Sequence, residues 1–305
     1  MNIELLSELG LLVGIELEGF YDSDKRGEMH AIADEYPDVV VGSDGSIVPD
    51  DDGSYNSVEI YPAYPLRVSE EDEIGDFLSF VSEFKRRVGL KVNSSCGTHI
   101  HFSLESGMPD GVTMPMMADA FLAATPLAYA LGGRRGWRRR SNSYARSSLL
   151  DVIGEGTPLP SGPAMRAYNG LFRSEKSWSL RLVSVRQRHF EMRAFPGTAN
   201  ILRLKTYLSL VFGVMEALAT GRLDSYRGEN GMLIDNPVFY GHTKQAIKAW
   251  LEILDWKQGG EWLGKYGLKQ STAVRQVDTS LVRYLTARGV SREEADDWVG
   301  EALGG

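Results

Sequence analysis

Three short segments of the chain alternate ionisable and apolar side chains. They are Gly14-Ile15-Glu16-Leu17-Glu18, Gly97-Thr98-His99-Ile100-His101-Phe102 and Phe190-Glu191-Met192-Arg193-Ala194. On a β-strand, residues i and i+2 project from the same face, about 6–7 Å apart. We therefore expect three strands whose apolar residues face a core and whose Glu, His and Arg side chains share the opposite face.

The shared face has the composition of a divalent metal site, with Glu16, Glu18, His99 and Glu191 as candidate ligands. Carboxylate oxygens with few nitrogens suit Mg²⁺ or Mn²⁺, whereas zinc would prefer more of the His and Cys side chains that are scarce here. Each pattern alone is typical of a solvated strand face or a surface ion pair. The prediction depends on all three patterns occurring together.

Length and composition are those of a globular protein of one or two domains, with 305 residues, 43% apolar and 24% charged. The net charge of −8 argues against a general nucleic-acid binder. Cys96 is the single cysteine, so no intramolecular disulfide is possible. We find no apolar run of membrane-spanning length and no basic start before the first apolar run. We expect a cytoplasmic protein, bacterial or virus-encoded in a bacterial host.

The hydrophobic pattern predicts an α+β fold. We expect strands over 11–20, within 37–62, over 97–104 and within 179–195. We expect helices over 72–88, 114–131, 200–220, 241–256 and 271–288, and a last helix from Ser291, where Glu294 completes a capping box. The stretches 133–148 and 154–163 are predicted loops. The change of character near Arg222 predicts a domain over 1–222 that bears the polar face, and a helical extension over 223–305 packed on it.

The polar segments resemble a known superfamily. The segment Asn93–Leu104 is similar to the Asn-Gly-Ser-Gly-x-His-x-His-x-Ser-Leu segment of glutamine synthetases, and Glu16-Leu17-Glu18 and Glu191-Met192-Arg193 resemble their metal-binding glutamates and Glu-x-Arg strand. The closer resemblance is to the amidoligase family of the carboxylate–amine ligases. It covers about residues 10–220 and includes, in order, Asp44-Gly45-Ser46, Val58-Glu59-Ile60, Cys96–His101 and Gly197-Thr198.

This resemblance implies a glutamine synthetase-like catalytic domain, a curved and mostly antiparallel sheet with helices packed on its convex face and ATP and metals on its concave face. It implies an ATP- and Mg²⁺- (or Mn²⁺-) dependent ligase that joins a carboxylate to an amine through an acyl phosphate. Small molecules or peptides would supply both groups. Ser94 replaces a glycine of the glutamate-binding loop, so glutamate itself is not implied as the substrate.

The resemblance also implies roles by position. Glu16, His99 and Glu191 would hold one metal, Glu18 with Glu59 would hold a second, and His101 and Arg193 would contact phosphates. Asp44 and Ser46 either bind substrate or nucleotide or shape a turn, because Asp-Gly is a strong turn signal. Cys96, next to this strand, is expected to pack rather than to act as a nucleophile.

The stretch from Arg134 to Arg146 holds six arginines and no acidic residue. The resemblance implies that Arg140 or Arg146 contacts ATP and the acyl phosphate. The stretch could equally be a solvated basic loop, or a footprint for nucleic acid or another polyanion. Two other functions therefore stay open: a metal-dependent hydrolase or phosphotransferase that uses the same Glu/His face, and a non-catalytic protein that binds nucleotide or polyanion.

Overall fold

The centre of the molecule is a seven-stranded sheet with the order β2-β3-β1-β5-β7-β6, in which β4 also pairs with β1. The computed structural model describes residues 2–49, 53–68, 73–139, 179–184, 186–229, 231–239, 243–256 and 270–303. Every pairing between the described strands is antiparallel. The strands are β1 (Leu11–Asp22), β2 (Val39–Gly42), β3 (Tyr55–Pro62), β4 (Leu66–Arg67), β5 (Gly97–Leu104), β6 (Leu180–Ser184) and β7 (His189–Pro196).

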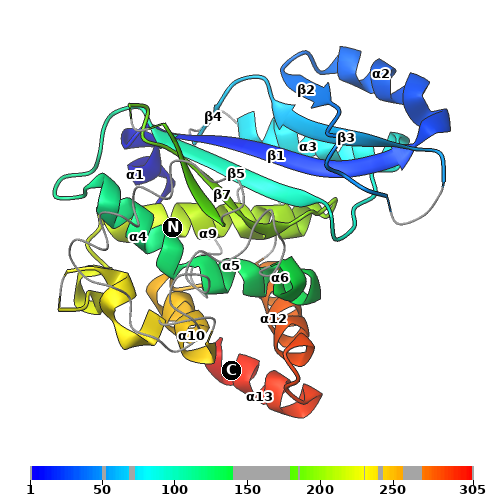
Figure 1. Ribbon diagram of the computed structural model, residues 1–305. Coiled ribbons are helices and arrows are strands. Elements are labelled where there is room, and N and C mark those ends of the chain that lie inside the picture. The colour runs from blue at the N-terminus through cyan, green and yellow to red at the C-terminus, as the bar shows by residue number, and fades with distance from the viewer. Residues whose placement is uncertain are drawn as a thin grey trace.

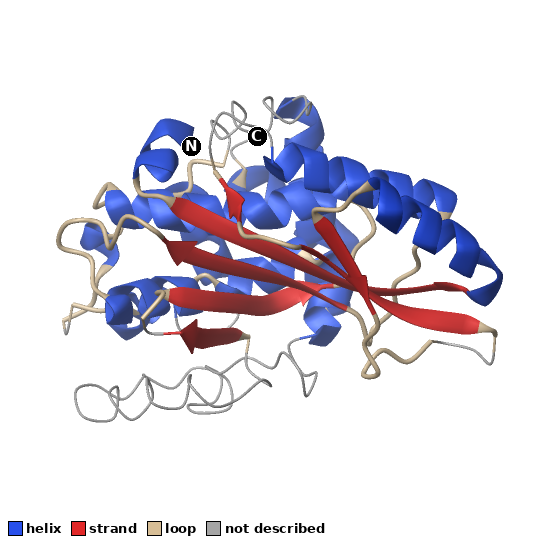
Figure 2. Cartoon of the chain, turned by 90° about the horizontal axis from the view of Figure 1, so that it is seen from above, coloured by secondary structure: helices blue, strands red, loops and turns tan. Residues whose placement is uncertain are grey.

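Helices cover one face of this sheet. Figure 1 shows α4, α5, α6 and α9 on one side of β1, β5 and β7, and Figure 2 looks onto the other side, where no described helix lies over these strands. This is the predicted α+β class; the glutamine synthetase-like part of that expectation stays a prediction.

The helices are α1 (Ile3–Glu8), α2 (Arg26–Glu35), α3 (Glu73–Arg87), α4 (Met114–Ala123), α5 (Thr125–Leu131), α6 (Gly133–Arg139), α9 (Ile201–Ala219), α10 (Lys244–Ile253), α12 (Gln270–Ala287) and α13 (Arg292–Ala302).

The core lies between the sheet and these helices. The apolar residues of the three alternating segments belong to this core and are all buried: Ile15, Leu17, Ile100, Phe102, Phe190 and Met192. The Phe102 ring stacks on Phe190 at 5.6 Å and packs against Phe121 of α4 at 4.1 Å between centroids. Because strand side chains alternate between faces, burying this set leaves the ionisable set on the opposite face. No described helix lies over that face, which we call the bare face.

The predicted helix over 114–131 consists of two helices. The chain bends by 42° between α4 and α5, and Pro126 lies in the first turn of α5. The indole Nε1 of Trp250 in α10 donates to the Ala123 carbonyl at the bend, at 2.7 Å. Among the described residues no single helix has the length and apolar composition of a membrane span; α4 and α5 together would have both, but only as this bent pair.

The predicted loop over 133–148 is wrong in its first half, because Gly133–Arg139 form α6. Its glycines permit close packing that a side chain would prevent. A Cβ on Gly136 would lie 1.8 Å from the Tyr129 carbonyl oxygen, and one on Gly132 would lie 2.7 Å from Pro196. Residues 140–148, with Arg140 and Arg146, lie outside the described residues, as does the loop predicted over 154–163.

The helices after residue 222 pack on the earlier ones: α10 and α12 both contact α5, and α12 also contacts α6 and α9. The domain boundary itself stays a prediction. Ser291 caps α13 by accepting a hydrogen bond from the Glu294 amide at 3.1 Å. The capping box is only half formed among the described residues, because the Glu294 carboxylate turns to Lys244 of α10, at 2.5 Å, and not back to the amide of Ser291.

Candidate metal centre

Glu16, His99 and Glu191 meet on the bare face of the sheet, one from each of β1, β5 and β7. Glu16 is the register partner of His99, and Glu191 is the partner of His101. The Nδ1 atom of His99 lies 2.5 Å from Glu16 Oε1 and 3.5 Å from Glu191 Oε1. One ligand atom from each residue lies within 4.8 Å of the other two. The antiparallel register therefore assembles two carboxylates and an imidazole, a donor set that fits a divalent cation.

Glu18 and Glu59 extend the acidic cluster toward β3, where they are register partners. The Glu18 carboxylate accepts a hydrogen bond from the Gly97 amide and lies 3.5 Å from His99 Nε2. Burial raises the pKa of Glu59 to about 7, with the negative charges of Glu16, Asp44 and Glu18 adding to the shift. The raised pKa indicates uncompensated negative charge beside Glu16, which either a proton or a cation would relieve.

Replacing Glu59 with glutamine is expected to stabilise the metal-free protein near pH 8 and to have no such effect near pH 4. Below about pH 4.5 the Glu59 carboxyl is protonated in both folded and unfolded chains, so its charge does not affect stability. Above about pH 7 it is ionised in both, and the folded state is destabilised by the full free energy of holding that charge. After allowance for solvent screening, the gain near pH 8 is on the order of 1 kcal/mol. Thermal unfolding with a chelator present measures this gain in stability. An equal gain at pH 4 and pH 8 would show that the gain does not come from removing a charge.

Glu16 and Glu191 remain carboxylates at neutral pH. Burial alone would raise the pKa of Glu16, but hydrogen bonds with His101 and His99 outweigh it and hold this pKa well below its usual range. Burial opposes ionisation of Glu191 as well, and the neighbouring side chains of Arg193, His99 and His101 lower its pKa nonetheless. Both side chains thus carry the charge that a metal ligand needs.

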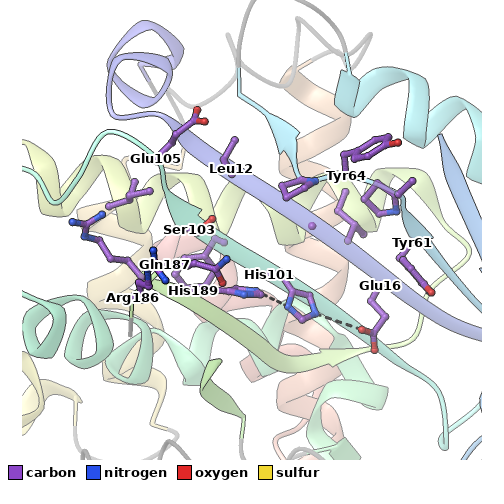
Figure 3. A pocket seen from close by; sticks show the side chains of 18 residues that line it. Leu12, Glu16, Tyr61, Tyr64, His101, Ser103, Glu105, Arg186, Gln187 and His189 are labelled. Carbon is purple, nitrogen blue, oxygen red and sulfur yellow. Dashed lines mark hydrogen bonds and ion pairs between the residues drawn. The ribbon is translucent and has the colours of Figure 1, made fainter. Parts of the chain in front are cut away.

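His101 connects the centre to His189, which the sequence analysis did not single out. His101 Nδ1 lies 2.9 Å from His189 Nε2, and its Nε2 lies 3.4 Å from Glu16 Oε2, so that the three side chains form the row in Figure 3. Burial, with the nearby His101, lowers the pKa of His189 to about 4. His189 is therefore neutral at pH 7. It stands two residues before Glu191, so extending the alternation by one step would have found it.

Two arginines hold Glu191 from either side. Arg193 Nη1 pairs with Glu191 Oε1, and Arg181 Nη1 lies 3.3 Å from Oε2. Arg193 was expected on this face and lies there, paired with Glu191; its phosphate contact stays a prediction. Arg181 was missed, because it reaches the site only through the pairing of β6 with β7, in which it is the register partner of Glu191.

A cavity of about 550 Å³ opens beside this cluster (Figure 3). Glu16, His101 and His189 line one part of it. The rest of its wall mixes aromatic, aliphatic and charged side chains, including Tyr61, Pro62, Tyr64, Pro65, Glu105, Arg186 and Arg188. The cavity is large enough for a small ligand and brings that ligand next to the metal-binding groups.

The chain is distantly similar to solved structures of other proteins. A structure described as the crystal structure of a novel glutamine synthase homolog is 14% identical to this chain, with a TM-score of 0.41, over 98% of this chain and 73% of the other. No known protein family matches the sequence, and no curated protein matches it. The relationship is distant and does not establish an activity.

The remaining predicted site residues lie at the margin of the centre or outside it. The amide and hydroxyl of Ser46 both donate to the Asp44 carboxylate, at 2.8 Å each, which is the turn geometry foreseen as one alternative. Contact of these two residues with substrate stays a prediction. Cys96 is buried in a cluster with Phe20 and Ile47, so packing is the correct interpretation.

Proposed function

We propose that this chain is an ATP- and Mg²⁺- (or Mn²⁺-) dependent ligase of the amidoligase type, which joins a carboxylate to an amine. The observation that supports it most is the convergence of Glu16, His99 and Glu191 beside an open cavity. Hard oxygen donors with one imidazole favour Mg²⁺ or Mn²⁺ over zinc. No described helix covers the ligand-bearing face of the sheet, so the described part of the chain leaves room above the ligands for a nucleotide.

The side chains divide into metal ligands and residues that support them. Glu16, His99 and Glu191 would hold one cation, and Glu18 with Glu59 a second. When bound, such cations neutralise the phosphate oxygens of ATP. Glu191 would keep its charge and orientation through Arg193 and Arg181, in the way that supporting partners fix metal ligands.

The proposed reaction has two displacements. An oxygen of the substrate carboxylate attacks the γ-phosphorus of ATP, and ADP leaves. The amine nitrogen then attacks the carbonyl carbon of the acyl phosphate, and inorganic phosphate leaves with the amide as product. His101 borders the cavity between Glu16 and neutral His189, where it is placed to take up the proton that the amine loses.

The decisive experiment is incubation with ATP, Mg²⁺ and pools of carboxylates and amines, followed by phosphate assay and mass spectrometry of products. A ligase releases phosphate only when both co-substrates are present and yields a product heavier than either. Phosphate release with one substrate and water would instead indicate a hydrolase or phosphotransferase on the same face. Nucleotide binding without any turnover would indicate the non-catalytic alternative.

Glu16→Gln is expected to abolish this phosphate release with the fold preserved, because a neutral amide replaces a ligand carboxylate that also positions His99 and His101. The assay above measures it, with circular dichroism as the check of folding. Turnover at the wild-type rate would remove Glu16 from the site.

A further inference from the structure

A second cavity, of about 1050 Å³, lies among the helices. It is bordered by α6, α12, the start of α9 and the end of α3. Figure 1 shows α6, α9 and α12 on the side of the sheet opposite to the bare face. Its wall shares no described residue with the metal centre or the first cavity. Among the described residues that line it, none is acidic and six are basic: Lys85, Arg134, Arg135, Arg138, Arg203 and Arg283.

Most of the cations in this wall have no ion-pair partner among the described residues. Within the described part of the chain, the structure records no ion pair for Lys85, Arg134, Arg135, Arg203 or Arg283. The adjacent arginines of α3 behave differently, since Arg86 pairs with Glu83 and Arg87 with Glu28 and Glu35. These cations repel one another around the cavity, and an anion bound among them would be attracted to all of them.

Two further features lie at the wall of the same cavity. The Nε atom of Arg203 is buried and has no hydrogen-bond partner, a state that proteins generally avoid. The 19-residue helix α9 begins at the wall, with Asn200 as its N-cap, and so turns its first-turn amides and the positive end of its dipole toward this region. The helix terminus and the cations of the wall both favour an anion in the cavity.

We propose that this cavity binds a compact polyanion that carries several phosphate groups, independently of the metal centre. Six cations from four helices surround one cavity, which suits a ligand with several negative charges close together better than a ligand with a single carboxylate. The described wall holds no aromatic ring on which a nucleobase could stack, and its apolar side chains are small ones, Val92, Ala199 and Ala287. A hollow in an acidic protein also lacks the extended basic surface that duplex nucleic acid needs.

Calorimetric titration of the full chain with inorganic tripolyphosphate, without divalent metal and near physiological salt, tests the proposal. Saturable binding is expected for the wild type. The affinity of Arg135→Glu and of Arg283→Glu should be lower by a factor of at least about ten, because each change replaces attraction of the anion with repulsion. Both side chains are exposed, so the fold should tolerate the changes. Arg292→Glu is the matched control, an exposed arginine on α13 paired with Asp296.

The outcomes separate this site from the proposed active site. Glu191→Gln should bind tripolyphosphate as the wild type does; a loss there would overturn an independent site and assign the anion to the metal centre. In the Glu191→Gln protein ATP should bind no tighter than tripolyphosphate, and much tighter ATP binding there would overturn recognition by phosphate alone. No saturable binding by the wild type, or the same loss in Arg292→Glu as in Arg135→Glu, would overturn the proposal outright.

Discussion

Replacing Glu191 with glutamine is expected to abolish divalent-metal binding and turnover while the fold persists. The Glu191 side chain is only 2% exposed and sits 3.5 Å from His99 Nδ1, in the middle of the ligand cluster. A neutral amide cannot supply the charge of the ligand, and its NH₂ group would face Arg193 or Arg181. The loss of affinity should exceed the roughly 10–100-fold typical of losing a residue that merely supports a ligand. Calorimetry with Mn²⁺, alongside the phosphate assay, measures both effects.

The matched control is Glu252→Gln, the same chemical change at an exposed position of α10. It should bind Mn²⁺ as the wild type does. Because Glu191 is buried between arginines, circular dichroism must show that its variant folds; if it does not, Glu16→Gln, whose side chain is 22% exposed, decides the question. Wild-type Mn²⁺ affinity in a folded Glu191→Gln protein would contradict the proposed metal centre.

The convergence of the candidate ligands could be predicted because strand periodicity is local. Glu16, His99 and Glu191 each belong to a short alternating segment, and antiparallel pairing of three such segments aligns their polar faces. His189 continues the same alternation and was within reach of the sequence. Arg181 was not, since it comes to Glu191 from a strand whose neighbour is fixed only by the tertiary fold.

The helical layer was harder to predict, because its breaks depend on contacts between distant elements. Gly132, Gly133 and Gly136 indicate a loop by local propensity, yet here Gly132 packs closely against Pro196 and Gly136 of α6 packs closely against Tyr129. The bend after Ala123 likewise places a carbonyl where the indole of Trp250, more than a hundred residues later, can donate to it. Neither Pro196 nor Trp250 is visible from the sequence around these breaks.

Asp119 illustrates a large energetic role without a sequence signal. It is a single acid in an apolar helix, 1% exposed, and its carboxylate accepts hydrogen bonds from the backbone amides of Leu233 at 2.7 Å and Ile234 at 3.0 Å. Asp119→Ala is expected to lower the free energy of unfolding by about 2–5 kcal/mol, since two buried amides would lose their acceptor. Urea unfolding followed by circular dichroism measures the loss.

Two control variants separate the effect of losing these hydrogen bonds from the general effect of removing an aspartate. Asp34→Ala removes an exposed aspartate from α2 and should change stability by no more than about 0.5 kcal/mol. Asp119→Asn keeps one oxygen as an acceptor but turns an NH₂ group toward the second amide, so its loss should be intermediate. If Asp119→Ala were as stable as Asp34→Ala, these bonds could not be what ties the segment at Leu233 to α4, and apolar packing alone would have to hold it there.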